Sequence, residues 1–174
     1  MDLKSTKYNF LFQKHKNDVY NYSIFMVGNK FDADDVVQDV FIKTWENINN
    51  FKIISAKAWL IKTTHNRCID MLRKRKINNK HETSIDENYS EPVSHEDLST
   101  EISNQITSQE ILKKVKQLPE NLKSVFILFE IHGFKYREIS KALDLPINSV
   151  KVYLMRARKK LQMELKNYEL HEVI

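Results

Sequence analysis

The chain has 174 residues, with only two glycines, three prolines and a net charge of +5. It contains no long apolar run, and its first ten residues lack the apolar core of a signal peptide, so we expect one or two globular domains without a membrane span or secretion signal. Lys and Arg outnumber Asp and Glu by 14 to 8 over residues 1–76 and by 13 to 8 over 106–174, but are outnumbered 7 to 1 over 77–105. Two basic modules around an acidic connector make nucleic acid a candidate ligand for both.

Three amphipathic helices are predicted before the connector, the first over about residues 9–26. The second begins at Asp32 or Asp34, since either carboxylate can cap free backbone amides. Its apolar side chains recur at helical spacing as one buried face, formed by Val37, Val40, Phe41, Trp45 and Ile48. The third helix covers about residues 57–76, with four side chains facing inward: Ile61, Thr64, Cys68 and Leu72. Its basic end, residues 73–76, is by itself typical of a solvated helix terminus.

Cys68 is the only cysteine of the chain, so no internal disulfide can form, which fits a reducing cytoplasm. Two residues separate it from His65, a spacing found in zinc sites, but no second pair of ligands at such spacing accompanies them. The sequence also has no Gly-rich phosphate loop, and no catalytic constellation stands out. We therefore predict no metal, no cofactor and no enzymatic activity.

Residues 77–105 are polar and acidic without sustained periodicity, which predicts a flexible linker or a segment ordered by a partner. After it, Pro119 opens a helix that Gly133 ends. A short helix over 136–143, a tight turn and a longer basic helix over about 147–165 follow the helix-turn-helix pattern. We expect an all-α chain of two small helical domains joined by a flexible linker, the second domain containing the helix-turn-helix. The expected bounds are 1–80 for the first domain, 81–105 for the linker and 106–174 for the second domain.

The last predicted helix has two unlike faces. At about 100° per residue, one narrow stripe faces the core, and it consists of Val150, Leu154, Ala157 and Leu161. The opposite side carries Val152 and Met155 among lysines and arginines, with no acid from 149 to 160. A DNA major groove suits this mixture, because cations meet phosphate or guanine and small apolar groups meet thymine methyls. A protein interface is the alternative, since exposed apolar residues also mark those.

With both halves in view, the chain resembles a bacterial sigma factor of the extracytoplasmic function (ECF) group. The stretch "DADDVVQDVFIKTWENI" resembles the part of sigma region 2 that docks on the clamp helices of RNA polymerase, and "AWLIKTTHNRCIDMLRKRK" is similar to the helix that melts and reads the minus-ten element. "LPENLKSVFILFEIHGFKYREIS" and "SVKVYLMRARKKL" resemble region 4, which reads the minus-thirty-five element. The third domain of housekeeping sigma factors has no room between residues 77 and 105.

The resemblance implies roles for residues at matching positions. The polymerase contacts would be Asp35, Gln38 and Asp39. The minus-ten DNA contacts would be Lys52, Lys57, Trp59, Asn66, Arg67 and Arg73, with residues 50–57 as a base-capturing loop and Asn66 holding an extruded base. The minus-thirty-five contacts would be Ser149, Lys151, Val152, Met155, Arg156 and Arg158, of which Ser149 and Arg158 meet phosphates. Two structural alternatives stay open, Asp35 as a helix cap and Asn66 as a buried amide. Asp144 stands at a turn position that relatives often fill with glycine.

The implied function is to direct core RNA polymerase to promoters and to help open the DNA, in the cytoplasm. The implied partners are promoter DNA, the beta-prime clamp helices and beta flap of polymerase, and an anti-sigma factor. The 29 residues of 77–105 could extend about 100 Å but would span about 30 Å as a free coil, so polymerase would have to hold the domains at separate promoter elements. The alternatives are a helix-turn-helix regulator that binds DNA as a dimer without polymerase, or a protein-interaction module.

Overall fold

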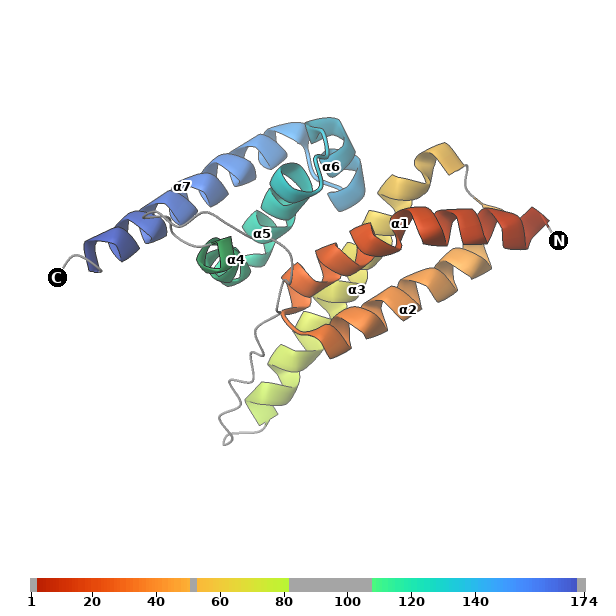
Figure 1. The fold of residues 1–174 in the computed structure, drawn as a ribbon, viewed down its shortest axis with the longest axis horizontal. Coiled ribbons are helices and arrows are strands. Elements are labelled where there is room, and N and C mark those ends of the chain that lie inside the picture. Colours follow the sequence, from red (N-terminus) through yellow and green to blue (C-terminus); the bar gives the residue numbers. More distant parts are fainter. Residues whose placement is uncertain (1–2, 51–52, 82–107, 172–174) are drawn as a thin grey trace.

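A computed structural model of the protein describes residues 3–50, 53–81 and 108–171, and these ranges contain helices and turns but no strand (Figure 1). The helices are α1 (Leu3–Val27), α2 (Lys30–Asn47), α3 (Ile53–His81), α4 (Ser108–Gln117), α5 (Glu120–Phe126), the π-helical turn η1 (Ile127–Ile131), α6 (Tyr136–Leu143) and α7 (Ile147–His171). The all-α fold class with two helical units is confirmed. The predicted linker, 81–105, lies outside the described residues except for its first one.

The first unit is a bundle in which α1 packs against both α2 and α3 (Figure 1). The buried stripe of α2 runs through Ala33, Val36, Val40 and Thr44. The prediction that Trp45 faces inward was wrong, because its side chain is 40% exposed and Lys4 lies over its ring. A prediction based on large apolar side chains overlooks small or polar residues such as alanine and threonine. They nevertheless permit close helix approach, and here they shift the buried face of α2.

The corner between α1 and α2 depends on two residues. Gly28 has a φ of 88°, a left-handed conformation that glycine adopts without steric cost. Asn29 then takes an extended conformation, and its side-chain oxygen accepts a hydrogen bond of 2.9 Å from the backbone N–H of Asp32. Asn29 is therefore the N-cap of α2, and the prediction of Asp32 or Asp34 as the cap was wrong by three or more residues.

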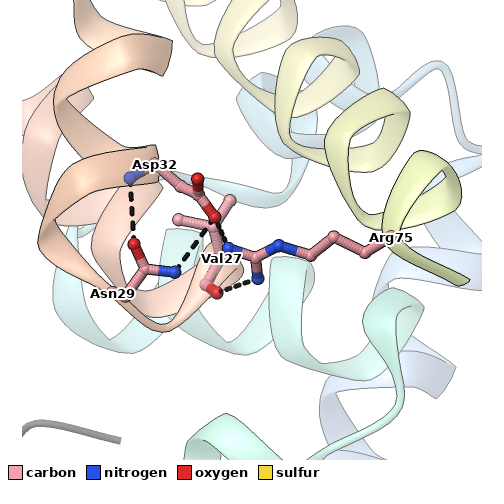
Figure 2. A network of polar contacts seen from close by, with 4 residues as sticks. All are labelled: Val27, Asn29, Asp32 and Arg75. Carbon is pink, nitrogen blue, oxygen red and sulfur yellow. Dashed lines mark hydrogen bonds and ion pairs between the residues drawn. The ribbon is translucent and has the colours of Figure 1, made fainter. Parts of the chain in front are cut away.

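Arg75 ties the same corner to α3 (Figure 2). Its guanidinium donates to the backbone carbonyl of Val27 at 3.0 Å and pairs with the carboxylate of Asp32. That carboxylate also accepts from the side-chain amide of Asn29 at 3.0 Å. Partial burial lowers the pKa of Arg75. The basic run 73–76 is thus not simply a solvated helix end, because one of its four cations joins three helices.

The bounds predicted for α3 were too narrow at both ends. The helix already includes residues 53–57, most of the stretch expected to be a loop, and it continues five residues beyond Lys76. No glycine or proline occurs between 53 and 81, so nothing local stops the helix. Its inward face is as predicted for Ile61, Thr64 and Cys68, all of which are buried.

The second unit contains the predicted helix-turn-helix. The bounds of α6 are those predicted, and Asp144 turns the chain with a left-handed φ of 55°. The backbone N–H of Leu145 donates to the carbonyl of Ser140 at 3.0 Å, while the hydroxyl of Ser140 donates to the carbonyl of Leu145 at 2.6 Å. The helix α7 then runs six residues beyond the predicted end at 165, because no glycine or proline interrupts it.

The core side of α7 is confirmed, since its four predicted residues are at most 5% exposed: Val150, Leu154, Ala157 and Leu161. They pack against α5, which Pro119 opens as predicted. A π-helical turn then continues α5, with the N–H of His132 donating to the carbonyl of Ile127 at 3.1 Å. Gly133, at a φ of 65°, ends the element.

The two bundles pack against each other and share one hydrophobic core. The helix α6 lies against α3, while α4, α5 and η1 touch α1 (Figure 1). At this contact Tyr22 donates or accepts a hydrogen bond of 2.9 Å with Nδ1 of His65, and its ring lies 6.2 Å from that of His132. The fold therefore positions the helix-turn-helix directly beside the basic helix α3.

Candidate nucleic-acid interface

The outer face of α7 combines charge and exposed apolar surface. Met155 is 62% exposed and Val152 37% exposed, and both stand beside exposed cations of the same helix. A shallow groove lies on one flank of this face, between α7 and Tyr136 of α6, and its α7 lining is Lys151, Leu154, Met155, Arg158, Lys159 and Gln162. The predicted contacts Lys151, Arg156 and Arg158 are exposed, and Ser149 is half-buried at the start of the helix. The structure thus brings all six predicted minus-thirty-five residues onto one helix.

Arg158 differs from its neighbours because another side chain already engages it. Its Nε and Nη2 donate to Oε1 of Glu130 at 2.8 and 2.6 Å, and its guanidinium lies 5.5 Å from the ring centre of Phe129. Phe129 stacks on Tyr136 at 4.9 Å, and Lys151 lies 6.0 Å from the centre of the Tyr136 ring. Sequence periodicity gave no sign of Glu130, whose charge offsets that of Arg158.

On α3, Trp59, Asn66 and Arg73 recur every seven residues and so share one face, rising about 10 Å per step. Asn66 and Arg73 are exposed and Trp59 is half-buried. The alternative that Asn66 is a buried amide is wrong for this structure. Ile77 continues the same face and is also exposed, although the sequence interpretation did not include it.

The remaining predicted minus-ten residues do not join that face. Arg67 lies about 100° away around α3 and pairs through its Nε with the carboxylate of Asp39 on α2. Lys57 reaches toward the second bundle, with its Nζ 4.3 Å from the centre of the Phe134 ring. Lys52 lies outside the described residues.

The exposed face of α2 carries two of the three predicted polymerase contacts. Asp35 and Gln38 are exposed, whereas Asp39 is half-buried against Arg67. Because Asn29 caps the helix, the alternative role of Asp35 as the cap is wrong. Phe31 and Ile42 extend the same face at 82% and 57% exposure. Phe31 lies four residues before Asp35 and Ile42 seven after it, so helical spacing could have predicted that both share its face. Helical spacing did predict the exposed Val152 and Met155 on the last helix.

Comparison with known proteins shows to which family the chain belongs. Sigma-70 region 2 matches residues 11–77 and Sigma-70 region 4 matches residues 108–161. The ECF RNA polymerase sigma factor SigW of Bacillus subtilis is 30% identical over 165 residues, covering 88% of this chain and 86% of that protein. The chain belongs to the ECF sigma factors. It therefore acts in promoter-specific transcription initiation with RNA polymerase, and the interpretation as a regulator that works without polymerase is set aside, because region 2 accounts for the first bundle.

Other matches cover a similar share of this chain. The ECF sigma factor SigM of Bacillus subtilis is 26% identical over 87% of this chain and 91% of its own length. Among solved structures, the sigma factor RpoE of Bartonella quintana, in complex with the anti-sigma factor NepR, matches with a TM-score of 0.71 at 24% identity, covering 89% of this chain and 94% of that one. CnrH, in complex with the cytosolic domain of CnrY, matches with a TM-score of 0.66 at 20% identity, covering 92% and 88%. Both structures share the fold of this sigma factor.

Burial shifts the ionisation of two side chains of α3 in this sigma factor. Burial raises the pKa of the Cys68 thiol to about 12 and lowers the pKa of His65 to about 4. With this raised pKa, Cys68 stays protonated at neutral pH. It therefore lacks the thiolate form that binds metals and acts as a nucleophile. Among the described residues no group of three His, Cys, Asp or Glu side chains could hold a metal ion. No helix in those same ranges has the length and apolar character needed to cross a membrane.

Proposed function

We propose that this sigma factor reads the minus-thirty-five element with the outer face of α7 and the minus-ten element with the Trp59–Asn66–Arg73 face of α3. Polymerase supplies the catalysis, and the sigma factor itself is neither an enzyme nor a cofactor-binding protein. The expected compartment is the cytoplasm, where bacterial polymerase works. The single observation that carries this proposal is the outer face of α7, where exposed Val152 and Met155 lie in an acid-free row of cations opposite a fully buried stripe.

The α7 face has what sequence-specific groove binding needs. Arg156 can donate two hydrogen bonds to a guanine edge, and Val152 and Met155 can contact thymine methyls. Lys151 would also face the groove, whereas Ser149 and Arg158 would meet phosphates at the rim, where contacts set register rather than sequence. Arg158, held by Glu130, would contribute less to base recognition than Arg156.

The α3 face suits single-stranded DNA. The exposed amide of Asn66 can pair with a base edge, and Trp59 offers a ring on which a base can stack. Binding of extruded bases would offset the few kcal/mol that unstacking costs. Arg73, one further step along the helix, can hold the backbone of the same strand.

The exposed face of α2 is the proposed polymerase-docking surface. Asp35 can pair with arginines of the clamp helices, while Phe31 and Ile42 supply apolar area of the kind that protein interfaces bury. Region 4 would meet the beta flap. An anti-sigma factor is a further proposed partner, in line with the structure of the related RpoE bound to NepR.

Promoter recognition by both bundles requires them to separate. In the structure α6 touches α3, whereas two promoter elements lie a few DNA turns apart, at about 35 Å per turn. We therefore propose that polymerase docking moves the second bundle away from the first.

Transcription from a library of genomic fragments, by core polymerase with and without the purified protein, tests this function. We expect a new set of start sites that share two upstream sequence elements. Start sites that do not change on addition of the protein, together with tight binding to duplex DNA in the absence of polymerase, would contradict it.

A further inference from the structure

Two lysines of α3 are held by carboxylates of the second bundle. The Nζ of Lys62 lies 2.6 Å from Oδ2 of Asp144, in the turn of the helix-turn-helix. The Nζ of Lys76 lies 2.6 Å from Oε1 of Glu120, at the start of α5. Each contact joins parts of the chain that are more than forty residues apart. Neither lysine belongs to the set of DNA contacts that the sequence predicted.

Both lysines border the minus-ten face of α3. At about 100° per residue, Lys62, Arg73 and Lys76 fall within an arc of about 60°, and Asn66 lies about 20° beyond Arg73. The two lysines are separated by 14 residues, which corresponds to about 21 Å along the helix axis. A basic track of this length beside a base-binding position matches the grooves that follow the backbone of a single strand over several nucleotides.

Carboxylate and phosphate oxygens present the same charge-assisted acceptor to an ammonium group. We propose that Lys62 and Lys76 are binding sites for single-stranded DNA phosphates and that Asp144 and Glu120 occupy them while the two bundles are packed together. This proposal rests on the proposed function of α3. Separation of the bundles would then uncover two phosphate sites at the moment when the strand needs them.

The backbone at Asp144 is consistent with a role for its charge. Its φ of 55° is a conformation that glycine adopts freely and most other residues avoid. A glycine would therefore form this turn with less strain but could not reach Lys62. The ion pair is also readily exchanged, because Asp144 is 80% exposed and Lys62 42% exposed, and surface pairs of this kind are weak. A polyanion can displace such a carboxylate.

The test is the affinity of the full-length protein for a short fluorescein-labelled single-stranded DNA oligonucleotide, measured without polymerase over a range of salt concentrations. Asp144→Asn is the main variant, since asparagine tolerates the left-handed backbone and only the charge is removed. We expect up to about fivefold tighter binding, the upper range for one surface ion pair. Glu46→Gln, an exposed carboxylate of α2, is the matched control. Glu120 is less suited to this test because it also stabilises the charge of buried Lys123.

The lysines are tested in the Asp144→Asn background. Lys62→Gln together with Lys76→Gln should reduce the slope of log affinity against log salt by about 1.4, because each phosphate that a lysine no longer neutralises lowers the slope by about 0.7. The control pair is Lys30→Gln with Lys43→Gln, two exposed lysines of α2. The proposal is overturned if the two pairs change the slope equally, or if Asp144→Asn binds no more tightly than Glu46→Gln.

Failure of the proposed phosphate sites can be distinguished from failure of the proposed function. Normal start-site selection with core polymerase, combined with no effect of the lysines on oligonucleotide binding, would overturn the phosphate sites alone. Loss of promoter-directed transcription by the unmodified protein would overturn the proposed function, whatever the oligonucleotide shows.

Discussion

The two basic helices of this sigma factor have similar compositions but deploy their cations differently. Along the outer face of α7, Lys151, Arg156 and Lys159 are exposed. Along α3, Arg67 and Arg75 pair with carboxylates of α2, and further cations reach the second bundle. The face proposed to read duplex DNA therefore has exposed cations already in the free protein. The face proposed for the melted strand is partly occupied by the protein itself.

The two faces of α7 give the largest expected contrast. Leu154→Ala should lower the free energy of unfolding by about 2–5 kcal/mol, because it leaves a cavity in the core, where Leu154 is 2% exposed. Met155→Ala, at the adjacent exposed position, should change it by less than about 0.5 kcal/mol. Urea denaturation followed by circular dichroism measures both. Equal losses would show that the outer face of α7 is part of a core.

Acid should destabilise the folded protein through His65. His65 faces Tyr22 of α1 and Glu120 of α5, and burial lowers its pKa from 6.5 to about 4. Because burial disfavours the charged form in the folded protein, despite the opposing charge of Glu120, the stabilisation is fully present above pH 6.5 and is lost as the pH falls toward 4. The loss should reach up to about 3 kcal/mol.

His132 contributes in the same direction. Burial lowers its pKa, although Asp18 of α1 partly opposes the effect, and Lys57 of α3 adds to it.

The His65 prediction is tested by the midpoint of urea unfolding between pH 7.5 and 4.5, for the protein and for His65→Gln. A variant with the same pH dependence as the unmodified protein would contradict the assignment to His65.

Arg75 and Arg73 sharpen the comparison within α3. Arg75→Ala should lower the free energy of unfolding by about 1–3 kcal/mol, because the buried carbonyl of Val27 loses a donor and the carboxylate of Asp32 keeps only the amide of Asn29. Arg73→Ala should leave stability almost unchanged and weaken binding to single-stranded DNA, since Arg73 is exposed. Thermal unfolding and oligonucleotide titration separate the two effects. The opposite pattern would reverse the roles assigned to these two arginines.

Arg156 and Arg158 make the corresponding pair on α7. Arg156→Ala should relax sequence preference in the upstream element by about 1–3 kcal/mol if it binds guanine through two hydrogen bonds. Arg158→Ala should have a smaller effect on preference, because Glu130 already holds its guanidinium. Competition binding of promoter variants by the polymerase holoenzyme measures both. A uniform loss on all sequences would assign Arg156 to phosphate contact instead.

Local sequence patterns predicted the helices of the helix-turn-helix well, but not the buried face of α2. The bounds of α6, the buried stripe of α7 and the exposure of Met155 all follow from periodicity and turn chemistry, which act over a few residues. The left-handed turn at Asp144 likewise lies at the position that relatives often fill with glycine.

What the sequence did not reveal are contacts between distant parts of the chain. Arg75 bonds to Val27, 48 residues away, and Arg67 pairs with Asp39, 28 residues away. No helical pattern contains that information, because such pairs depend on how the helices pack. The start of α3 was predicted about four residues too late, although nothing in residues 53–57 breaks a helix.

The most direct test of the account is the distance between the two bundles, followed by fluorescence energy transfer between dyes on Lys43→Cys and Lys160→Cys, both exposed positions. The native thiol of Cys68 is buried, with a pKa raised to about 12, so it should resist labelling. We predict high transfer in the free protein and a large decrease when core polymerase and promoter DNA are added. High transfer that persists in a complex making RNA would contradict the account.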